Sequence, residues 1–333
     1  MKIFISIASY QDPMLLETIC SAYTHAINKD GLRFGICEQS DNPTNLNNLE
    51  FFDQIEYELV DPVMAKGPCW ARERIQRYCK DEEYYLQVDS HTVFYAGWDG
   101  ILLSYYNWIK ESGINKFVIT GYPRSFKPNK FRNSFDLNVQ FKSTLGITFR
   151  EGRLFEDNYF SMQKSYPAKT YRPVKGLLVA AGFMFSESDL IKEIPYDPNL
   201  YFHGEELSLA LRLFTHGWDI VHIPRVPLFH LYTDVNNLPR KLHWNKDDEK
   251  NRAVKWNELD RSSKQRLGQL ILGQIDDKYG LGNKRTVKEF SNLCGLDLKQ
   301  KKVIDLEKAT EYFPFEVIER SDYPFKEVVV KND

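Results

Sequence analysis

The sequence of 333 residues lacks the features that mark several specialised classes of protein. Its five cysteines are scattered and odd in number, which excludes a close pair of zinc ligands and argues against a disulfide framework. No segment approaches the ~20 apolar residues of a transmembrane helix. The formal net charge of -2 shows no excess of either sign that would favour nucleic acid. We therefore expect reduced cysteines and no nucleic-acid partner.

The overall composition is typical of a folded globular protein. Hydrophobic residues make up 42% and aromatic residues 14%, and the length suffices for one large or two ordinary domains. The first residues form a strand-like segment that is too short for the core of a signal peptide. A cytoplasmic location is therefore the expectation, and peripheral contact with a membrane stays open.

Apolar, β-branched segments alternate along the chain with segments of helical period. The predicted strands span 3–8, 32–37, 55–60, 84–89, 117–120 and 219–223, and the predicted helices span 14–22, 70–78, 188–194, 207–216, 247–256 and 262–272. This alternation predicts an α/β fold with a mostly parallel central sheet. We expect one catalytic domain over 1–240, in which 124–175 forms a long loop or small subdomain, and a helical C-terminal extension over 241–333.

The most informative motif is Asp89-Ser90-His91, which ends a predicted strand. Alternate residues of an extended backbone point the same way, so the carboxylate and the imidazole can face one ion. This pair of ligands suits Mn2+ or a similar divalent ion. The alternative interpretation is a polar turn that closes with an ordinary surface histidine. His230 is the preferred third ligand, and His222 is its rival.

Six short motifs occur in a fixed order along the chain. They are Ile5-Ser6-Ile7-Ala8-Ser9-Tyr10, Gly67-Pro68 with Arg72, Gln87-Val88-Asp89-Ser90-His91, Ala181-Gly182-Phe183, His203-Gly204-Glu205-Glu206 and Phe229-His230. This order resembles the cytoplasmic hydroxyproline-directed polypeptide N-acetylglucosaminyltransferases and their bacterial relatives. The Asp-x-His motif with a distant histidine is also similar to the mucin-type polypeptide N-acetylgalactosaminyltransferases. Both resemblances imply a GT-A nucleotide-sugar fold.

The resemblance also implies where a nucleotide-sugar would bind. Asp89, His91 and His230 would hold Mn2+, or Mg2+, together with the diphosphate of a UDP-sugar donor. In α/β sheets ligands bind beyond the carboxyl ends of the strands. Asp89 lies at such an end, as do Ser9, Tyr10 and Glu38 on the first two predicted strands.

Four further residues receive roles in nucleotide binding from the same resemblance. Ser9 would hydrogen-bond the uridine, Tyr10 would stack on the uracil, and Glu38, or Gln39 in its place, would meet the edge of the base. Arg72 would contact the nucleotide or a phosphate through its forked guanidinium. The alternative for Arg72 is an ordinary solvated arginine on a helix.

Gly182, Glu205 and Glu206 complete the predicted site. Gly182 permits close approach of the backbone to a ligand, and the resemblance places it beside the donor sugar. The alternative for Gly182 is a bulge in a strand. Glu205 and Glu206 would act at the sugar, although carboxylates before a helix also serve as partners of the helix dipole. Adjacent carboxylates rarely reach the ~5 to 9 Å separation that glycoside hydrolysis requires.

These observations predict a metal-dependent, retaining glycosyltransferase that moves N-acetylglucosamine from UDP-GlcNAc to a hydroxyl of a protein or glycan. Use of another UDP-sugar, for example in capsule or surface polysaccharide synthesis, is the close alternative. A non-catalytic nucleotide-sugar-binding protein and a scaffold protein are the alternatives of another class. The hydroxyproline acceptor of the eukaryotic relatives is not carried over, because the loop 124–172 contains no matching motif.

Overall fold

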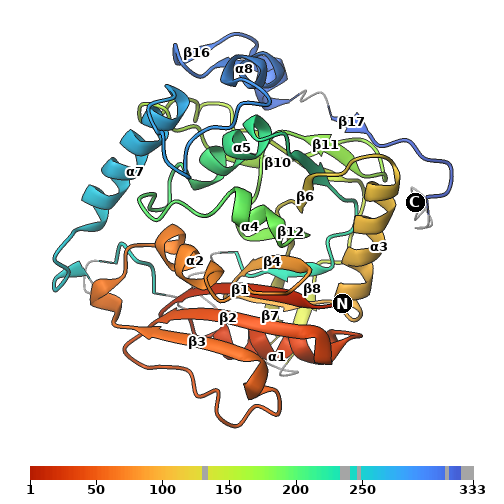
Figure 1. The fold of residues 1–333 in the computed structure, drawn as a ribbon, viewed down its shortest axis with the longest axis vertical. Coiled ribbons are helices and arrows are strands. Elements are labelled where there is room, and N and C mark those ends of the chain that lie inside the picture. Colours follow the sequence, from red (N-terminus) through yellow and green to blue (C-terminus); the bar gives the residue numbers. More distant parts are fainter. Residues whose placement is uncertain (130–133, 233–240, 246–248, 312–314, 324–333) are drawn as a thin grey trace.

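A nine-stranded sheet forms the centre of the molecule, as the computed structural model shows for residues 1–129, 134–232, 241–245, 249–311 and 315–323. The strand order is β17-β11-β13-β6-β12-β4-β1-β2-β3 (Figure 1). These strands are β1 (Ile3–Tyr10), β2 (Leu32–Gln39), β3 (Ile55–Val60), β4 (Tyr84–Asp89), β6 (Phe117–Thr120), β11 (Val174–Gly176), β12 (Phe183–Glu187), β13 (Asp219–His222) and β17 (Glu316–Val317). All six predicted strands are present in this sheet.

The sheet is parallel in one half and mixed in the other. β1 pairs in parallel with both β2 and β4, and β2 pairs in parallel with β3. β12 then runs antiparallel between β4 and β6, and β11 runs antiparallel to β13. The prediction of a mostly parallel sheet is therefore correct for the first half only, because an apolar pattern shows that a strand is buried and does not show its direction.

Helices cover both faces of the sheet (Figure 1). They are α1 (Leu15–His25), α2 (Pro68–Gln76), α3 (Trp98–Glu111), α4 (Asp189–Glu193), α5 (Glu205–Thr215), α7 (Trp256–Ile271), α8 (Val287–Cys294) and α9 (Leu306–Thr310), with short 3-10 helices at Lys29–Gly31, Phe52–Gln54 and Pro62–Met64. Alternate residues of a strand face opposite sides, so Ile5 of β1 packs in a core with α1 and α3 while Phe4 packs against α2. The sequence analysis missed α3, although its buried residues repeat at helical spacing.

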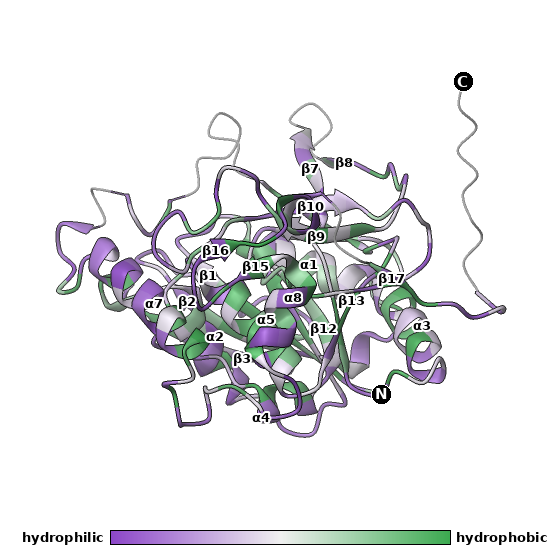
Figure 2. Cartoon of the chain, turned by 90° about the horizontal axis from the view of Figure 1, so that it is seen from above, coloured by the Kyte–Doolittle hydropathy of each residue, from purple (hydrophilic) through white to green (hydrophobic). Residues whose placement is uncertain are grey.

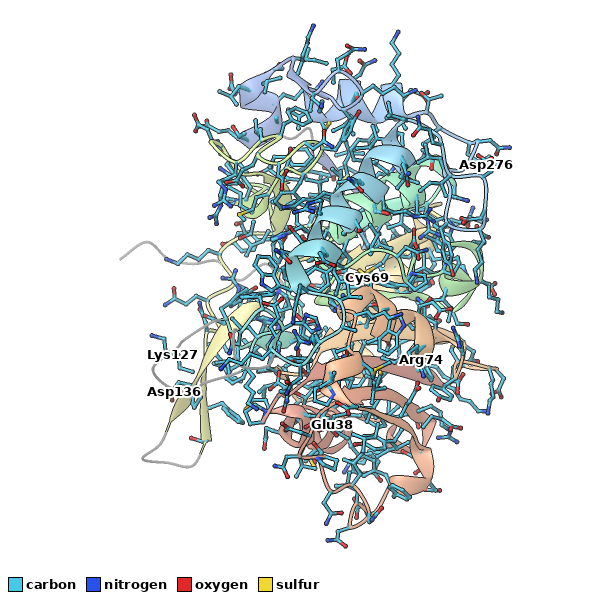
Figure 3. All side chains as sticks on the ribbon, turned by 90° about the vertical axis from the view of Figure 1, so that its left-hand side faces the viewer. Glu38, Cys69, Arg74, Lys127, Asp136 and Asp276 are labelled. Atoms are coloured by element: carbon cyan, nitrogen blue, oxygen red, sulfur yellow. The ribbon has the colours of Figure 1, made fainter. Side chains whose placement is uncertain are left out.

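The segment predicted as a long loop or subdomain, 124–175, contains short hairpins. β7 (Arg124–Asn129) and β8 (Ser134–Leu137) join β5 (Thr92–Phe94) and β14 (Leu228–His230) in a four-stranded sheet, and β9 (Leu145–Phe149) pairs with β10 (Gln163–Pro167). Figure 3 shows the β7–β8 hairpin, marked by Lys127 and Asp136, projecting from the side of the molecule. β14 pairs with β5, which follows β4 directly, and so lies next to the end of β4, where the predicted ligands lie.

The predicted C-terminal extension packs against the α/β core. Leu267 and Ile271 of α7 and Phe290 of α8 lie in the same hydrophobic cluster as the buried face of α5, and β17 pairs with β11 at the edge of the sheet. A last hairpin joins β15 (Leu296–Asp297) and β16 (Lys302–Val303). In Figure 2 the hydrophobic colours concentrate on the central elements, whereas α7 is largely hydrophilic along its length. The boundary at residue 240 lies outside the described residues and stays a prediction.

The two helices predicted over 247–256 and 262–272 differ from the observed elements. The helix predicted over 262–272 is confirmed as part of α7, which begins earlier, at Trp256. Of the helix predicted over 247–256, residues 247 and 248 lie outside the described residues, and 251–255 are not helical, so this prediction was wrong there. Among the helices that the structure describes, none is both long and apolar enough to span a bilayer.

Truncation of Leu267 to alanine tests whether α7 belongs to the core. The side chain is 0% exposed, so Leu267→Ala should lower the free energy of unfolding by about 2 to 5 kcal/mol. Leu272, just past the end of the same helix, is 40% exposed, and Leu272→Ala should change that free energy by less than about 0.5 kcal/mol. Urea denaturation measures both changes. Equal effects of the two variants would show that α7 does not pack as described.

Candidate functional site

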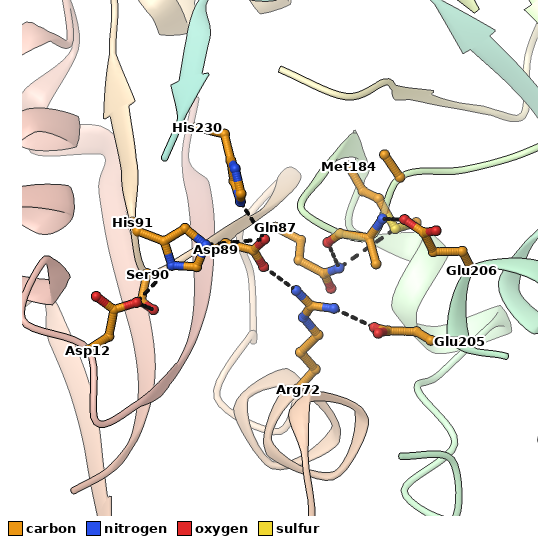
Figure 4. Close-up of polar contacts among 12 residues, drawn as sticks. Asp12, Arg72, Gln87, Asp89, Ser90, His91, Met184, Glu205, Glu206 and His230 are labelled. Carbon is orange, nitrogen blue, oxygen red and sulfur yellow. Dashed lines mark hydrogen bonds and ion pairs between the residues drawn. The ribbon is translucent and has the colours of Figure 1, made fainter. Parts of the chain in front are cut away.

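A cluster of three possible metal ligands lies at the carboxyl end of β4. Asp89 is the last residue of β4, and His91 follows in the tight turn that leads into β5. β14 pairs antiparallel with β5, and this register sets His230 opposite Thr92. The ligand atoms of Asp89, His91 and His230 all lie within 4.8 Å of one another. His230 Nε2 is 3.0 Å and His91 Nε2 is 3.9 Å from Asp89 Oδ2 (Figure 4).

Asp12, which the sequence analysis did not select, orients His91. Its Oδ2 accepts hydrogen bonds from His91 Nδ1 at 2.7 Å and from Ser90 Oγ at 2.8 Å, and its Oδ1 accepts from the Met14 N–H. Because Nδ1 of His91 donates to the carboxylate, Nε2 is the nitrogen available to a metal. The sequence signal was Asp12-Pro13, directly before the helix predicted over 14–22.

The turn itself is fixed by the first helix. The Thr18 hydroxyl on α1 donates to the Ser90 carbonyl at 2.7 Å and accepts from the Thr92 N–H at 3.0 Å. Both partners flank His91 in the chain. The backbone that carries His91 is therefore held by a buried side chain as well as by the sheet.

Arg72 joins Asp89 to Glu205 in the interior of the site. The guanidinium is 3% exposed; its Nη2 donates to Asp89 Oδ1 at 2.7 Å, and its Nη1 donates to Glu205 Oε1 (Figure 4). Burial disfavours the charged form of Asp89, yet the His230 hydrogen bond and the Arg72 charge hold the pKa of this carboxyl well below its usual value. Arg72 is thus not a solvated helix arginine, and its predicted contact with a nucleotide stays a prediction.

Glu205 and Glu206 start α5 and lie on the far side of the site from His91 (Figure 4). Burial raises the pKa of Glu205 although the Arg72 charge opposes the shift. Glu206 accepts hydrogen bonds from the Tyr122 hydroxyl at 2.9 Å and from the Ala181 N–H at 3.0 Å. Both carboxylates therefore already have donors, which makes them parts of a fixed wall.

A cavity of about 310 Å³ lies between the cluster and α5. Its lining includes the predicted residues Arg72, Asp89, Gly182, Glu205, Glu206 and His230. Gly182 is needed in this wall, because a Cβ atom there would lie 2.7 Å from Asp89 Oδ2. The structure thus brings six of the predicted residues together around one space, with His91 beside them.

Ser9, Tyr10 and Glu38 lie on the neighbouring strands and do not line this cavity. Ser9 pairs with Glu38, and Ala8 pairs with Asp89, so both strand ends reach the same edge of the sheet as the cluster. Glu38, labelled in Figure 3, accepts hydrogen bonds from the Thr44 and Tyr57 hydroxyls. Arg252 covers the Tyr10 ring and donates to its hydroxyl.

His222, the rival metal ligand, lies elsewhere. Its side chain is fully buried on β13, and Nδ1 is 2.9 Å from the Thr120 carbonyl. Burial lowers the pKa of His222 to about 4, so it is neutral at pH 7. It is not part of the three-residue cluster, so His230 is the histidine that the fold sets beside Asp89.

Comparison with known proteins identifies the fold. A family model described as Glycosyltransferase (GlcNAc) matches residues 44–300. A crystal structure of GalNAc-T7 with UDP, GalNAc and Mn2+ is 13% identical, with a TM-score of 0.57, and the match covers 88% of this chain but only 56% of that chain. This likeness shows a GT-A fold. No curated protein matches.

Two other solved structures match with lower TM-scores. S. aureus TarS in complex with UDP-GlcNAc is 12% identical, with a TM-score of 0.43, covering 82% of this chain and 73% of that chain. The mannosyltransferase PcManGT from Pyrobaculum calidifontis in complex with GDP-Man and Mn2+ is 11% identical, with a TM-score of 0.46, covering 71% of this chain and 58% of that chain.

Replacement of Asp12 tests the orientation of His91. Asp12→Asn keeps the size of the side chain and removes its charge, so Mn2+ should bind about 10- to 100-fold more weakly, as with other second-sphere partners of metal-binding histidines. Titration with Mn2+, followed by the EPR signal of the free ion, measures this affinity. Asp61→Asn is the matched control, because Asp61 also accepts a backbone N–H, from Val63 at 2.9 Å, outside the cluster. Equal affinities of the two variants would contradict the assignment.

Glu206 should make stability depend on pH. Burial raises its pKa to about 7, against ~4.3 in an unfolded chain, so the folded state binds the extra proton between these values. The free energy of unfolding should therefore fall, relative to Glu206→Gln, by up to about 3 kcal/mol as pH rises from 5 to 8. Urea denaturation at both pH values measures it, with the exposed Glu258→Gln as control. A constant difference between wild type and Glu206→Gln would refute the raised pKa.

Proposed function

The chain belongs to the Glycosyltransferase (GlcNAc) family, and we propose that it transfers N-acetylglucosamine from UDP-GlcNAc to a hydroxyl acceptor with the help of a divalent metal ion. The family makes the protein a glycosyltransferase. The observation that carries the metal and donor proposal is the cluster of Asp89, His91 and His230 on the wall of a cavity whose opposite wall is the start of α5. The wall with the three possible metal ligands suits a diphosphate, and the wall at the start of α5 suits a sugar.

The residues of the cluster fit a divalent ion of the Mn2+ type. One carboxylate oxygen and two imidazole nitrogens form a mixed set, whereas Mg2+ prefers oxygen ligands alone. The hydrogen bond from His91 Nδ1 to Asp12 is the usual second-sphere contact of a metal-binding histidine. A bound ion would neutralise charge on the diphosphate as the sugar bond breaks. The GalNAc-T7 structure, which has the same fold, contains UDP and Mn2+.

The residues of the cavity would hold the donor sugar. Glu206 fixes the Ala181 N–H and the Tyr122 hydroxyl, and Gly182 lets the backbone approach the ligand. Ser9, Tyr10 and Glu38, at the ends of β1 and β2, would receive the uridine along the same edge of the sheet. For Tyr10 this requires that Arg252 move from the face of its ring or share it with the base.

We propose transfer with retention of configuration. The acceptor oxygen forms a bond to C1 of the sugar, the bond from C1 to the diphosphate oxygen breaks, and the acceptor proton passes to the leaving diphosphate. Glu205 is held by Arg72 and Glu206 by two donors, so neither is presented as a free nucleophile. The protein would act by positioning and by stabilising charge.

A UDP-release assay across several UDP-sugars tests this function without a known acceptor. Release should be fastest with UDP-GlcNAc, should stop with chelator, and should fall by about 100-fold or more in Asp89→Ala, which loses a metal ligand and the partner of Arg72. Asp81→Ala, at an exposed carboxylate, is the control and should match wild type.

The outcomes separate the parts of the proposal. Faster release from another UDP-sugar would show that this other sugar nucleotide is the donor. Release that survives chelator and Asp89→Ala would refute the metal site. Retention from UDP-GlcNAc gives an α-linked product of transfer, so a β-linked product in the NMR spectrum would refute the proposed stereochemistry.

A further inference from the structure

His203 lies on the cavity wall two residues before Glu205, and helix α7 holds it there. Its Nδ1 donates to Asp260 Oδ1 at 2.7 Å, and Asp260 in turn pairs with Lys264 at 2.7 Å. The ring lines the cavity, and the bond to Asp260 leaves Nε2 as the nitrogen for a ligand. The function proposed above does not use this pair of residues.

The loop that carries His203 is fixed by the same helix. The Ser263 hydroxyl donates to the His203 carbonyl at 2.7 Å and accepts from the Tyr201 N–H at 3.0 Å. Lys264 also pairs with Asp157 at 2.7 Å, in the segment that leads to Phe160. α7 therefore ties together two segments of the cavity wall that are distant in sequence.

Two phenylalanine rings lie close to His203. The Phe160 ring lies 4.8 Å and the Phe202 ring 5.4 Å from the imidazole, measured between centroids. Trp244 continues the row at 5.5 Å from Phe202. Phe202 is 46% exposed and Trp244 is 38% exposed, which is unusual for side chains of this size. We call Phe160, His203, Phe202 and Trp244 the aromatic row.

The aromatic row lies where an acceptor would approach. Asp89 and His230 line the same cavity as Phe160, His203 and Phe202, and the exposure of Phe202 marks the side that opens to solvent. A cavity of about 310 Å³ is at the small end of ligand sites, so a donor sugar leaves room for little more inside. The second substrate must then rest on the rim.

We propose that the aromatic row is the acceptor subsite and that the acceptor is a sugar unit of a glycan. A sugar ring presents a flat face of C–H groups, which packs on an aromatic ring, and an edge of hydroxyls, which suits His203 Nε2 and the Gln163 amide of the cavity lining. Asp260 is the positioning residue that fixes His203. This inference rests on the proposed function and names the substrate class of the same site.

The test offers wild-type enzyme, UDP-GlcNAc and Mn2+ two acceptor panels at equal concentration. One contains methyl glycosides and disaccharides of common hexoses, and the other contains peptides with serine, threonine or hydroxyproline. Labelled sugar should enter the glycan panel. With the best glycan, Phe202→Leu and Asp260→Asn should each raise the ratio of acceptor KM to donor KM about tenfold. Phe202→Leu removes an aromatic contact, and Asp260→Asn weakens the hydrogen bond that orients His203.

Two control variants match these substitutions outside the cavity. Phe52→Leu changes a phenylalanine that is 44% exposed, and Asp219→Asn changes an aspartate paired with Arg285 at 2.7 Å. Both should retain the wild-type ratio, and thermal melting checks that every variant folds. Label in the peptides, UDP release without any labelled glycan, or an unchanged ratio in Phe202→Leu and Asp260→Asn would overturn the inference. Absence of UDP release from wild type would instead overturn the proposed function.

Discussion

The buried guanidinium of Arg72 is the interaction on which the site depends. It lies on α2 and binds Asp89 at the end of the next strand, β4, and Glu205 at the start of the distant helix α5, so three elements meet at one cation. Buried charges are tolerated only when they are paired and hydrogen-bonded. Loss of either carboxylate would leave the buried guanidinium with one partner fewer, so the two carboxylates and the cation stabilise one another in this arrangement.

Around this ion network the fold separates two kinds of chemistry. On one side, β5 and β14 bring His91 and His230 to Asp89, and Asp12 and Thr18 fix the turn between β4 and β5. On the other side, α5 presents carboxylates whose donors come from the cavity wall. A diphosphate leaving group needs positive charge and a sugar needs fixed hydrogen-bonding partners, so this division suits transfer of a glycosyl group.

The C-terminal part of the chain packs against the α/β core and contacts the cavity wall. α7 buries Leu267 against α5 and supplies Asp260, Ser263 and Lys264 to the segments that carry His203 and Phe160. Arg252, from the segment before α7, contacts Tyr10 at the end of β1. Residues beyond 240 thus contact both the cavity wall and the end of β1.

The sequence by itself determined the local elements and the first two candidate metal ligands. Period-2 and period-3.6 patterns are local, so the strands of the first half, helices α1, α2 and α5, and the spacing of Asp89 and His91 were predictable. Only the tertiary structure decided that His230 rather than His222 meets Asp89, that Arg72 binds Glu205 at 133 residues' distance, and that β12 runs antiparallel. Those facts depend on strand direction, register and side-chain packing between distant segments, which a local pattern does not encode.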